Sequence, residues 1–288
     1  MAASIEVRHL RHTYSTGTPF QRDALVDLNL TVESGEFLGI IGHTGSGKST
    51  LIQHLNGLLK PTEGQILIGG QDIWQNKQTL RAARFRVGLV FQYPEHQLFE
   101  ESVRKDIAFG PKNMGLAEAE VERRVLRAAQ FAGVAPAVLD KSPFDLSGGQ
   151  KRRVAIAGVI AMEPEVVIFD EPTAGLDPAG CDGLLENIRA YREATGATVL
   201  MISHSMDDVA RLADRLVVLN HGHIELSGTP AEVFAHAERL HEIGLSVPQV
   251  TQLFTRLREL GIDVDPATYT LEQAKTQLLK LLGGARNA

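Results

Sequence analysis

The amino-acid sequence predicts an α/β fold built on a largely parallel β-sheet. The apolar segments at residues 166–169, 198–202 and 216–219 are continuous, as expected for strands that are buried on both faces. Helical segments separate these strands, which is the order of elements in βαβ units. A glycine-rich turn, residues 42–49, follows another apolar strand and precedes a helix. The length of 288 residues fits one large domain, alone or with a small appendage.

The first half of the chain is expected to contain short strands on both sides of one helix. The helix, residues 49–59, ends at Lys60 and Pro61 because proline cannot continue a helix. The strands before and after it are expected at residues 5–7, 28–32, 36–41, 65–68 and 87–91.

A helical section interrupts the strands from about residue 94 to residue 161. Within it, residues 118–132 are expected to form a helix with alternating charges on its exposed face. After Gly228 the chain changes to short helices, the first of which opens with the capping box Thr229 to Glu232. We therefore expect one domain over residues 1–229 and a helical extension over residues 230–288.

Two further helices are expected in the extension. Ser246 is expected to cap a helix from Val247, and Thr270 with Gln273 to open the last helix. Their apolar residues recur on one face of each helix, which is typical of packing surfaces: Val250, Leu253, Phe254, Leu257 and Leu260, then Leu271, Ala274, Leu278 and Leu281.

The composition is that of an ordinary globular protein, 43% hydrophobic and 22% charged. With a net charge of −6, the chain has no overall basic field to attract nucleic acid. The single cysteine, Cys181, excludes an internal disulfide and is expected to be a packing residue. No apolar run approaches the ~20 residues that span a bilayer, and the first residues lack a secretory signal pattern. We therefore expect a protein of the cytosol that reaches a membrane only through partners.

The glycine-rich turn fits the phosphate-binding pattern G-x-x-x-x-G-K-[ST]. Glycine lets backbone N–H groups turn inward around phosphate oxygens, and the following helix adds its positive end. In this pattern the lysine reaches the β- and γ-phosphates, and the serine hydroxyl joins Mg²⁺. The predicted phosphate site comprises Gly42, His43, Thr44, Gly45, Ser46, Gly47, Lys48 and Ser49.

Polar residues at the ends of three predicted strands complete this chemistry. Asp170 is placed to hold Mg²⁺, and Glu171 is then free to orient or deprotonate an attacking water. Gln92 is placed to contact Mg²⁺ or that water, and His204 to hydrogen-bond the γ-phosphate. Phosphoryl transfer depends mainly on positioned charge and an in-line water, which these residue types supply.

Residues 146–150 read LSGGQ and carry the most specific signal in the chain. Ser147 is expected at the N-cap of a helix with Gln150 at its third position, a capping-box pattern. Gly148 and Gly149 leave backbone N–H groups unshielded, and the helix aims its positive end at an anion, worth about 0.3–2 kcal/mol. A capped helix start is common, so the functional interpretation depends on its place between the phosphate loop and the acidic strand end.

With these motifs in this order, residues 4–228 resemble the ATPases of ABC transporters. The resemblance implies a P-loop NTPase fold with a RecA-like core, a helical subdomain at about residues 94–161 and an antiparallel β subdomain. It implies an ATP hydrolase coupled to transport, an ABC-type translocase, with ATP and Mg²⁺ as cofactors. The expected Mg²⁺ ligands are Ser49, Gln92 and Asp170, and the expected catalytic residues are Glu171, His204 and Gln92.

The same resemblance assigns roles to residues outside these motifs. Tyr14 stands where the family places an aromatic residue that stacks on adenine, and Thr50 completes the ATP-binding loop. Asp177 is the expected D-loop aspartate. In this family the signature caps ATP that a second subunit holds, through Ser147, Gly148, Gly149 and Gln150.

A narrower resemblance is carried by residues 92–101, QYPEHQLFEE, residues 106–111, DIAFGP, and residues 42–45, GHTG. These segments look like the second, A′-type ATPase of energy-coupling-factor (ECF) transporters, which import vitamins. The resemblance implies a second related ATPase, a transmembrane scaffold (T) protein and an exchangeable substrate-binding (S) membrane protein. The chain would lie peripherally at the cytoplasmic face of the membrane, with its helical extension helping to hold the two ATPases together. Coupling helices of the scaffold would contact Glu95, Leu98, Phe99 and Glu100.

Two other functions stay open at this point. The chain would keep its chemistry as the ATPase of another importer, either a cobalt- or nickel-type system or one that depends on a soluble binding protein. A soluble ABC ATPase acting on DNA or ribosomes is disfavoured, because such proteins usually join two cassettes or carry a long coiled coil. The sequence does not identify the transported substrate, since another polypeptide selects it, nor does it decide between a homodimer and a heterodimer.

Overall fold

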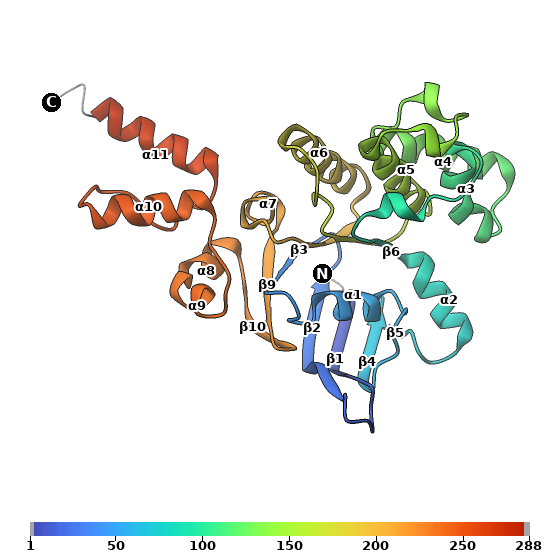
Figure 1. Cartoon of the computed structure of the whole chain (residues 1–288), viewed down its shortest axis with the longest axis horizontal. Helices are drawn as coiled ribbons and strands as arrows, with labels where there is room; N and C mark the ends of the chain where they lie inside the picture. The colour runs from blue at the N-terminus through green and yellow to red at the C-terminus, as the bar shows by residue number, and fades with distance from the viewer. Residues whose placement is uncertain (1–2, 285–288) are drawn as a thin grey trace.

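The computed structural model describes residues 3–284, which form an α/β core with helical groups at both ends (Figure 1). The central sheet has six strands in the order β10-β9-β3-β8-β7-β6. All neighbouring strands pair in parallel except β10, which pairs antiparallel with β9. The strands are β3 (Phe37–Ile41), β6 (Val87–Val90), β7 (Val166–Asp170), β8 (Thr198–Ile202), β9 (Arg215–Asn220) and β10 (His223–Gly228).

A second sheet is antiparallel, in the order β2-β1-β4-β5. It consists of β1 (Ala3–Tyr14), β2 (Arg22–Glu33), β4 (Glu63–Ile68) and β5 (Gln71–Asp72). β1 and β2 are much longer than the strands expected at residues 5–7 and 28–32. His9 and Asp27 have φ angles of 49° at irregularities of the β1–β2 pairing, so the alternation of apolar and polar residues is broken there.

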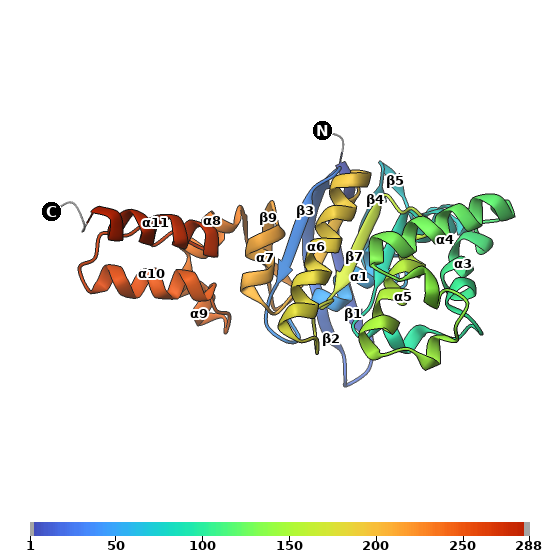
Figure 2. The same cartoon turned by 90° about the horizontal axis from the view of Figure 1, so that it is seen from above.

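The two faces of the central sheet bury different layers, because successive side chains of a strand point to opposite faces. In β3, Leu38 and Ile40 join the core with the antiparallel sheet and α1 (Lys48–Leu55). Phe37 and Ile41 join the core that the helices of the other face provide, which include α6 (Pro178–Thr195) and α7 (Met206–Leu212). Figures 1 and 2 show α6 and α7 over this second face.

The helical section occupies one end of the molecule, in green in Figure 1. It contains α3 (Val103–Asn113), α4 (Glu118–Ala132) and α5 (Gly148–Ile160), with 3₁₀ turns at Pro94–Gln97, Pro136–Val138 and Pro143–Asp145. α2 (Lys77–Arg86) precedes β6. The bounds of α4 are those predicted. Val121 and Val125 of α4 pack in the same core as Val154 and Ala157 of α5, which joins the section to the sheet.

The C-terminal helices are α8 (Pro230–Ala235), α9 (Ala237–Glu242), α10 (Gln249–Glu259) and α11 (Leu271–Gly284). The capping box at Thr229 is present, and the Thr270 hydroxyl accepts from the Gln273 N–H before α11. The cap predicted at Ser246 is wrong. α10 begins at Gln249 with Pro248 as its N-cap, because a proline disfavours helical backbone at the residue before it.

These helices belong to two packing units. Val233, Phe234 and Leu240 of α8 and α9 are buried in the main core. Residues of α10, α11 and the loop between them form a separate small core: Val250, Phe254, Val264 and Ala274. Figures 1 and 2 show α10 and α11 side by side and directed away from the sheets. Between residues 3 and 284, no helix combines the length and the apolar character needed to cross a bilayer.

Candidate nucleotide-binding site

The glycine-rich turn connects the end of β3 to the start of α1 and is pressed between two neighbouring segments. A Cβ atom at Gly42 would lie 2.4 Å from the carbonyl oxygen of Leu219 in β9. One at Gly47 would lie 2.7 Å from the carbonyl oxygen of Ala24 in β2, and Gly47 also has a φ of 109°. Only glycine fits such close approaches and this left-handed backbone, so the shape of the turn depends on both residues.

Lys48 and Ser46 place polar groups inside this turn. Lys48 is 7% exposed, and its Nζ donates hydrogen bonds to the carbonyl oxygens of Gly42 at 2.6 Å and His43 at 3.1 Å. Burial lowers the pKa of Lys48, an effect that the carboxylates of Glu171 and Asp170 oppose. The Ser46 Oγ is buried without a hydrogen-bond partner in the described part of the chain. A bound phosphate would supply the partner that the Ser46 hydroxyl lacks and further acceptors for the Lys48 ammonium, so the turn fits an anionic ligand.

Two carboxylates follow β7, as the sequence predicts. Asp170 is the last residue of the strand, and burial, followed by repulsion from Glu171, raises the pKa of Asp170 to about 6. Glu171 has a left-handed φ of 51°, and its N–H donates to the Ile202 carbonyl oxygen at 3.0 Å. Burial raises the pKa of Glu171, while the backbone hydrogen bond from His204 and the charge of Lys48 act in the opposite direction. A strained backbone and elevated carboxyl pKa values at one strand end are features of functional sites.

His204 closes this acidic cluster. Its backbone N–H donates to Glu171 Oε2 at 3.3 Å, and its Nε2 lies 3.1 Å from Glu171 Oε1. The second approach lacks hydrogen-bond geometry, so Oε1 is buried without a hydrogen-bond partner among residues 3–284. Burial and the charge of Lys48 lower the pKa of His204. The imidazole therefore faces the carboxylate mainly as a neutral ring that is available to a further acceptor or donor.

The oxygen donors around this edge suit a magnesium ion. Asp170 offers a carboxylate, and Ser49 offers an exposed hydroxyl one residue after Lys48. Among residues 3–284, no three His, Cys, Asp or Glu side chains cluster as a self-contained metal site. Mg²⁺ is commonly held by one or two protein groups together with substrate phosphates, so the residues present fit an ion that arrives with a nucleotide.

Parallel pairing brings the predicted strand-end residues to one edge of the sheet. β6 pairs with β7, β7 with β8, and β8 with β3, so all four carboxyl ends lie together. Gln92 follows β6 by two residues and is exposed at this edge, where Asp170 ends the neighbouring strand β7 and His204 follows β8 by two residues. The structure thus brings the turn, Gln92, the two acids and His204 to the same side of the sheet.

Tyr14 lies at the end of β1 beside the turn. A cavity of about 190 Å³ is lined by Tyr14, Arg22, Ala24, Gly45, Gly47, Lys48, Ser49 and Thr50. Tyr14 is 41% exposed, and its hydroxyl lies 3.2 Å from Thr50 Oγ1. An exposed aromatic ring beside a phosphate turn supports the expected stacking on a base.

Two histidines behind Tyr14 were not found by the sequence analysis. The His12 ring packs edge-on against the Tyr14 ring, with centroids 4.5 Å apart. His12 Nδ1 lies 3.2 Å from His54 Nε2, and the other ring nitrogen of His54 lies 2.7 Å from the Thr50 carbonyl oxygen. Burial lowers the pKa of His54 to about 4. Because His12 and His54 are 42 positions apart, no local sequence pattern predicts their contact.

The signature residues lie at the start of α5 and do not line the cavity at the turn. Ser147 is the N-cap; its Oγ accepts from the Gln150 N–H, and its own N–H donates to Gln150 Oε1 at 3.0 Å, which confirms the predicted capping box. Gly148 and Gly149 are exposed, and a Cβ atom at either would meet nothing within 4 Å. Nothing in the described chain therefore requires glycine at these two positions.

A buried arginine in α5, missed by the sequence analysis, links three of the motif segments. Arg152 is 4% exposed and forms a bidentate ion pair with Glu95, at 3.0 and 3.1 Å. Its Nη1 also donates to the carbonyl oxygens of Pro172 and Ala174, just beyond Glu171. Asp177, the next motif residue, caps α6 by accepting from the Gly180 N–H at 3.1 Å.

A groove of about 330 Å³ lies between the segment after β6 and helices α3 and α5. Leu98 is buried in its floor, while Phe99 is 57% exposed and packs edge-on against Phe109. The backbone N–H groups of Phe99 and Glu100 donate to the buried Asp106 carboxylate, which fixes this segment. Of the residues expected to contact a scaffold, Phe99 is the most accessible, and Glu95 is turned inward to Arg152.

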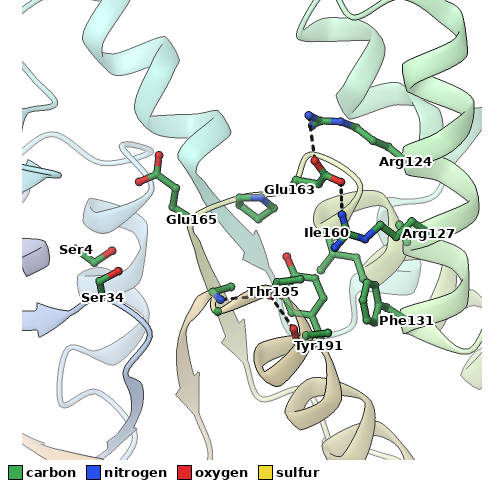
Figure 3. A pocket seen from close by; sticks show the side chains of 15 residues that line it. Ser4, Ser34, Arg124, Arg127, Phe131, Ile160, Glu163, Glu165, Tyr191 and Thr195 are labelled. Atoms are coloured by element: carbon green, nitrogen blue, oxygen red, sulfur yellow. Dashed lines mark hydrogen bonds and ion pairs between the residues drawn. The ribbon is translucent and has the colours of Figure 1, made fainter. Parts of the chain in front are cut away.

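A larger cavity, of about 420 Å³, lies elsewhere, between α4, α6 and the start of β7 (Figure 3). Figure 3 shows Arg124 and Arg127 of α4 both reaching Glu163, at 3.1 Å in each pair. Because each of these cations already pairs with a carboxylate, the cavity offers no counterpart to the phosphate turn. It is a gap where the helical section packs against α6.

Comparison with known proteins identifies the family. The family model described as ABC transporter matches residues 25–174, from β2 to just beyond Glu171. The chain belongs to the ABC transporter family. The matched span of this ABC domain contains the phosphate turn, the LSGGQ signature and the acidic strand end.

Relatives within the ABC family are ATP-binding proteins of ECF transporters. The chain is 54% identical over 283 residues to the energy-coupling factor transporter ATP-binding protein EcfA2 of Caldanaerobacter subterraneus subsp. tengcongensis, covering 98% of this chain and 99% of that protein. The EcfA2 protein of Clostridium perfringens is 54% identical over 280 residues, covering 97% and 98%. The chain is therefore an ABC ATPase of the ECF group that couples ATP hydrolysis to transport.

Solved structures agree with this ABC fold. The structure of cbiO1 from Clostridium perfringens, described as part of the ABC transporter complex cbiONQ, superposes with a TM-score of 0.76 at 38% identity, covering 91% of this chain and 98% of that chain. A post-hydrolysis dimer of the ATP-binding cassette MJ0796, bound to ADP and Pi, has a TM-score of 0.71 at 27% identity, covering 78% and 98%.

Proposed function

We propose that this chain is one of two related ATPases that power an ECF importer of vitamins or other micronutrients. Its partners are the second ATPase, a transmembrane T scaffold and an exchangeable S protein that binds the substrate. The chain lies peripherally at the cytoplasmic face of the membrane. The EcfA2 relatives support the transporter class, and the observation that carries the two-subunit arrangement is the open pair of signature glycines.

Gly148 and Gly149 support the presence of a second subunit, because no contact within this chain requires glycine at either position. A Cβ atom at Gly148 or Gly149 would meet only open space, and both have negative φ angles that other residues adopt easily. The capping box leaves further N–H groups of the first turn pointing outward at the positive end of α5. A backbone kept free of side chains is what close approach to a nucleotide on another subunit requires.

Each residue at the sheet edge then has a role in hydrolysis. Lys48 exchanges its bonds to Gly42 and His43 for oxygens of the β- and γ-phosphates. Ser49, Asp170 and Gln92 would hold Mg²⁺, which supplies charge neutralisation on the phosphates when bound. Glu171 orients the attacking water and accepts its proton, for which the elevated pKa of this carboxyl is suited.

His204 and Tyr14 position the two ends of the nucleotide. The His204 ring lies beside Glu171, where its backbone N–H bonds the carboxylate, and it would hydrogen-bond the γ-phosphate. Tyr14 provides the platform for adenine, with Thr50 and the rest of the turn below it. The remaining loop residues, His43, Thr44, Gly45 and Ser46, surround the phosphates with backbone N–H groups.

The groove between residues 95–100 and α3 supports docking of the scaffold's coupling helices. Phe99 and Phe109 present an apolar edge pair at its rim, and Leu98 forms the floor. Glu100 remains accessible for a polar contact, whereas Glu95 acts through its ion pair with Arg152. Scaffold movement would therefore reach α5 through the Glu95 to Arg152 pair.

Helices α10 and α11, within the extension of residues 230–288, support contact between the ATPases. Their small core leaves several large apolar side chains exposed: Leu253, Leu260, Leu271, Leu279 and Leu282. Apolar side chains exposed along one pair of helices are typical of an interaction surface. The domain formed by residues 1–229 would then meet its partner through the signature as well.

Purification of the tagged chain from its native membrane tests the whole proposal. Recovery of a related ATPase with two membrane proteins is the expected result. A related complex of the cobalt type is the second candidate, because cbiO1 of the cbiONQ complex superposes closely. Vitamin uptake against cobalt or nickel uptake by the reconstituted complex separates the two, and recovery with ribosomes or DNA-repair proteins would refute both.

A further inference from the structure

The β9–β10 hairpin lies directly against the phosphate turn. The Gly222 N–H donates to the Ser46 carbonyl oxygen at 2.9 Å, and Asn220 Oδ1 lies 3.2 Å from His43 Nε2. The rings of His43 and His221 are also in contact, with centroids 4.9 Å apart. Three contacts therefore fix the hairpin to the turn, and two of them involve His43.

The same hairpin is tied on its other side to the C-terminal helices. Arg239 of α9 donates from Nε at 2.8 Å and from Nη2 at 2.6 Å to Glu225 Oε1 on β10. The other oxygen of Glu225 accepts from Asn220 Nδ2 at 3.2 Å. Hydrogen bonds from Arg239, followed by that from Asn220, lower the pKa of Glu225, so its carboxylate is charged and accepts from both.

These contacts form one continuous series from α9 to the phosphate turn. A carboxylate only accepts hydrogen bonds, so Glu225 fixes the Asn220 amide with its NH₂ toward Glu225 and its oxygen toward His43. The Asn220 oxygen accepts from the His43 tautomer that carries its proton on Nε2, and Nδ1 of that tautomer lies 2.9 Å from the Thr44 carbonyl oxygen without a proton to donate to it. Residues from both ends of this series of contacts line one cavity of about 390 Å³. Its lining residues are His43, Asn220, His221, Arg239, Glu242 and Ile243.

The carbonyl groups at this place are those that hold Lys48. Its Nζ donates hydrogen bonds to the carbonyl oxygens of Gly42 and His43. The position of the His43 backbone therefore determines the position of the Lys48 ammonium group before ATP binds. The contact of Gly42 with Leu219 adds a second link to the same strand, β9.

The geometry points to Glu225 and Arg239 as positioning residues for ATP binding, which act through Asn220 and His43 on the phosphate turn. Helix α9 thus has a role beyond contact between ATPases: it sets the affinity of this chain's own turn for ATP. This inference depends on the proposed role of the turn as the ATP site. It assigns to Arg239 of α9 and to Glu225 of β10 the link between the extension and that site.

The test compares Arg239→Ala and Glu225→Gln with the unchanged chain in the assembled complex. Both variants are expected to raise the KM for ATP about fivefold or more with kcat unchanged, the lower range of measured couplings between sites. Arg239→Lys keeps the cation and is expected to recover part of the loss. Binding of a fluorescent ATP analogue to the isolated chain should weaken by a similar factor.

A matched control is available on α6. Arg189 is an exposed helix arginine that contacts the carboxylates of Glu186 and Glu193, as Arg239 contacts those of Glu225 and Glu242, but it has no link to the turn. Arg189→Ala should change Tm as little as Arg239→Ala and leave KM unchanged. An equal KM shift in both variants would mean that lost surface charge, and not positioning, is the cause.

A double-mutant cycle with His43→Ala gives the sharpest readout. If the effect passes through His43, Arg239→Ala should add little to the KM of the His43→Ala variant. Additive effects would overturn the inference, as would an unchanged KM in Arg239→Ala and Glu225→Gln. Lys48→Ala separates this inference from the proposed site: if that variant still binds and hydrolyses ATP, the assignment of the turn itself fails.

Discussion

Glu95→Gln is expected to destabilise the chain by about 3 kcal/mol, because it leaves the buried cation of Arg152 without its counter-ion. Removing one partner of a buried ion pair costs roughly 3–5 kcal/mol. The lower end applies here, since Arg152 keeps the carbonyl oxygens of Pro172 and Ala174 as acceptors. For a chain of this size, about 3 kcal/mol corresponds to a fall in Tm of roughly 6–12 °C.

The effect has a defined dependence on pH. Burial alone would raise the pKa of Glu95, but the hydrogen bonds and charge of Arg152 outweigh it, and the pKa lies below its ordinary value of 4.5. A carboxyl whose pKa is depressed by folding stabilises the protein fully above its unfolded pKa. That contribution disappears as the pH falls through the folded pKa. From about pH 6 to 8, the Tm difference between the unchanged chain and Glu95→Gln should therefore be constant at the full value of roughly 6–12 °C. Below about pH 4.5 this Tm difference should shrink.

Calorimetry of the purified chain measures this difference directly. Glu100→Gln serves as the control, because it removes a carboxylate of the same segment that has no ion pair among the described residues. Combining Glu95→Gln with Arg152→Met should cost less than the sum of the two single changes, since the double variant has no unpaired charge. A Tm for Glu95→Gln equal to that of Glu100→Gln, or strict additivity in the cycle, would refute the reasoning.

Three further predictions concern the proposed activity. Glu171→Gln should retain ATP binding in equilibrium measurements and slow hydrolysis by the complex at least about 100-fold, the lower range for loss of a general base; unchanged turnover would remove Glu171 from that role. Gly149→Ala should leave Tm unchanged or slightly higher, because its Cβ meets open space, yet reduce hydrolysis by the complex; normal hydrolysis would contradict contact with a partner's nucleotide. Replacing Phe99 and Phe109 with alanine should lower recovery of the membrane proteins without changing ATP affinity, and normal recovery and uptake would exclude the groove as the docking site.

The parts of the site that the sequence predicts are those encoded by local segments. The phosphate turn needs glycine where its backbone touches β9 and β2. The spacing of glycines in the sequence therefore reflects the geometry of the turn directly. The capping boxes at Ser147 and Thr229 are satisfied within four residues and formed as predicted. Parallel strands place their ends at one edge, and this is why Gln92, Asp170 and His204 lie at the same edge although they are distant in sequence.

The parts that the sequence does not predict depend on contacts between distant segments. Arg152 and Glu95 are 57 positions apart, and each alone resembles an ordinary surface charge. The length of β1 was underestimated because the irregularity at His9 interrupts its alternation, and only pairing with β2 restores the strand. The start of α10 was misplaced because the effect of Pro248 on its predecessor outweighs the capping preference of Ser246.

Arg152 explains how the signature and the hydrolytic residues of the proposed mechanism keep fixed positions relative to each other. The signature faces outward from α5, whereas the hydrolytic residues of this chain lie at the edge of the sheet. The Arg152 guanidinium bonds both to Glu95, beside the groove, and to the backbone just after Glu171. Because a buried cation cannot lose one acceptor without a large cost, the residues after β6, the start of α5 and the segment after Glu171 move together or not at all. We infer that a force applied at the groove reaches the signature and the hydrolytic carboxylate through this single side chain, and Glu95→Gln would uncouple transport from hydrolysis even where it leaves both ATP sites intact.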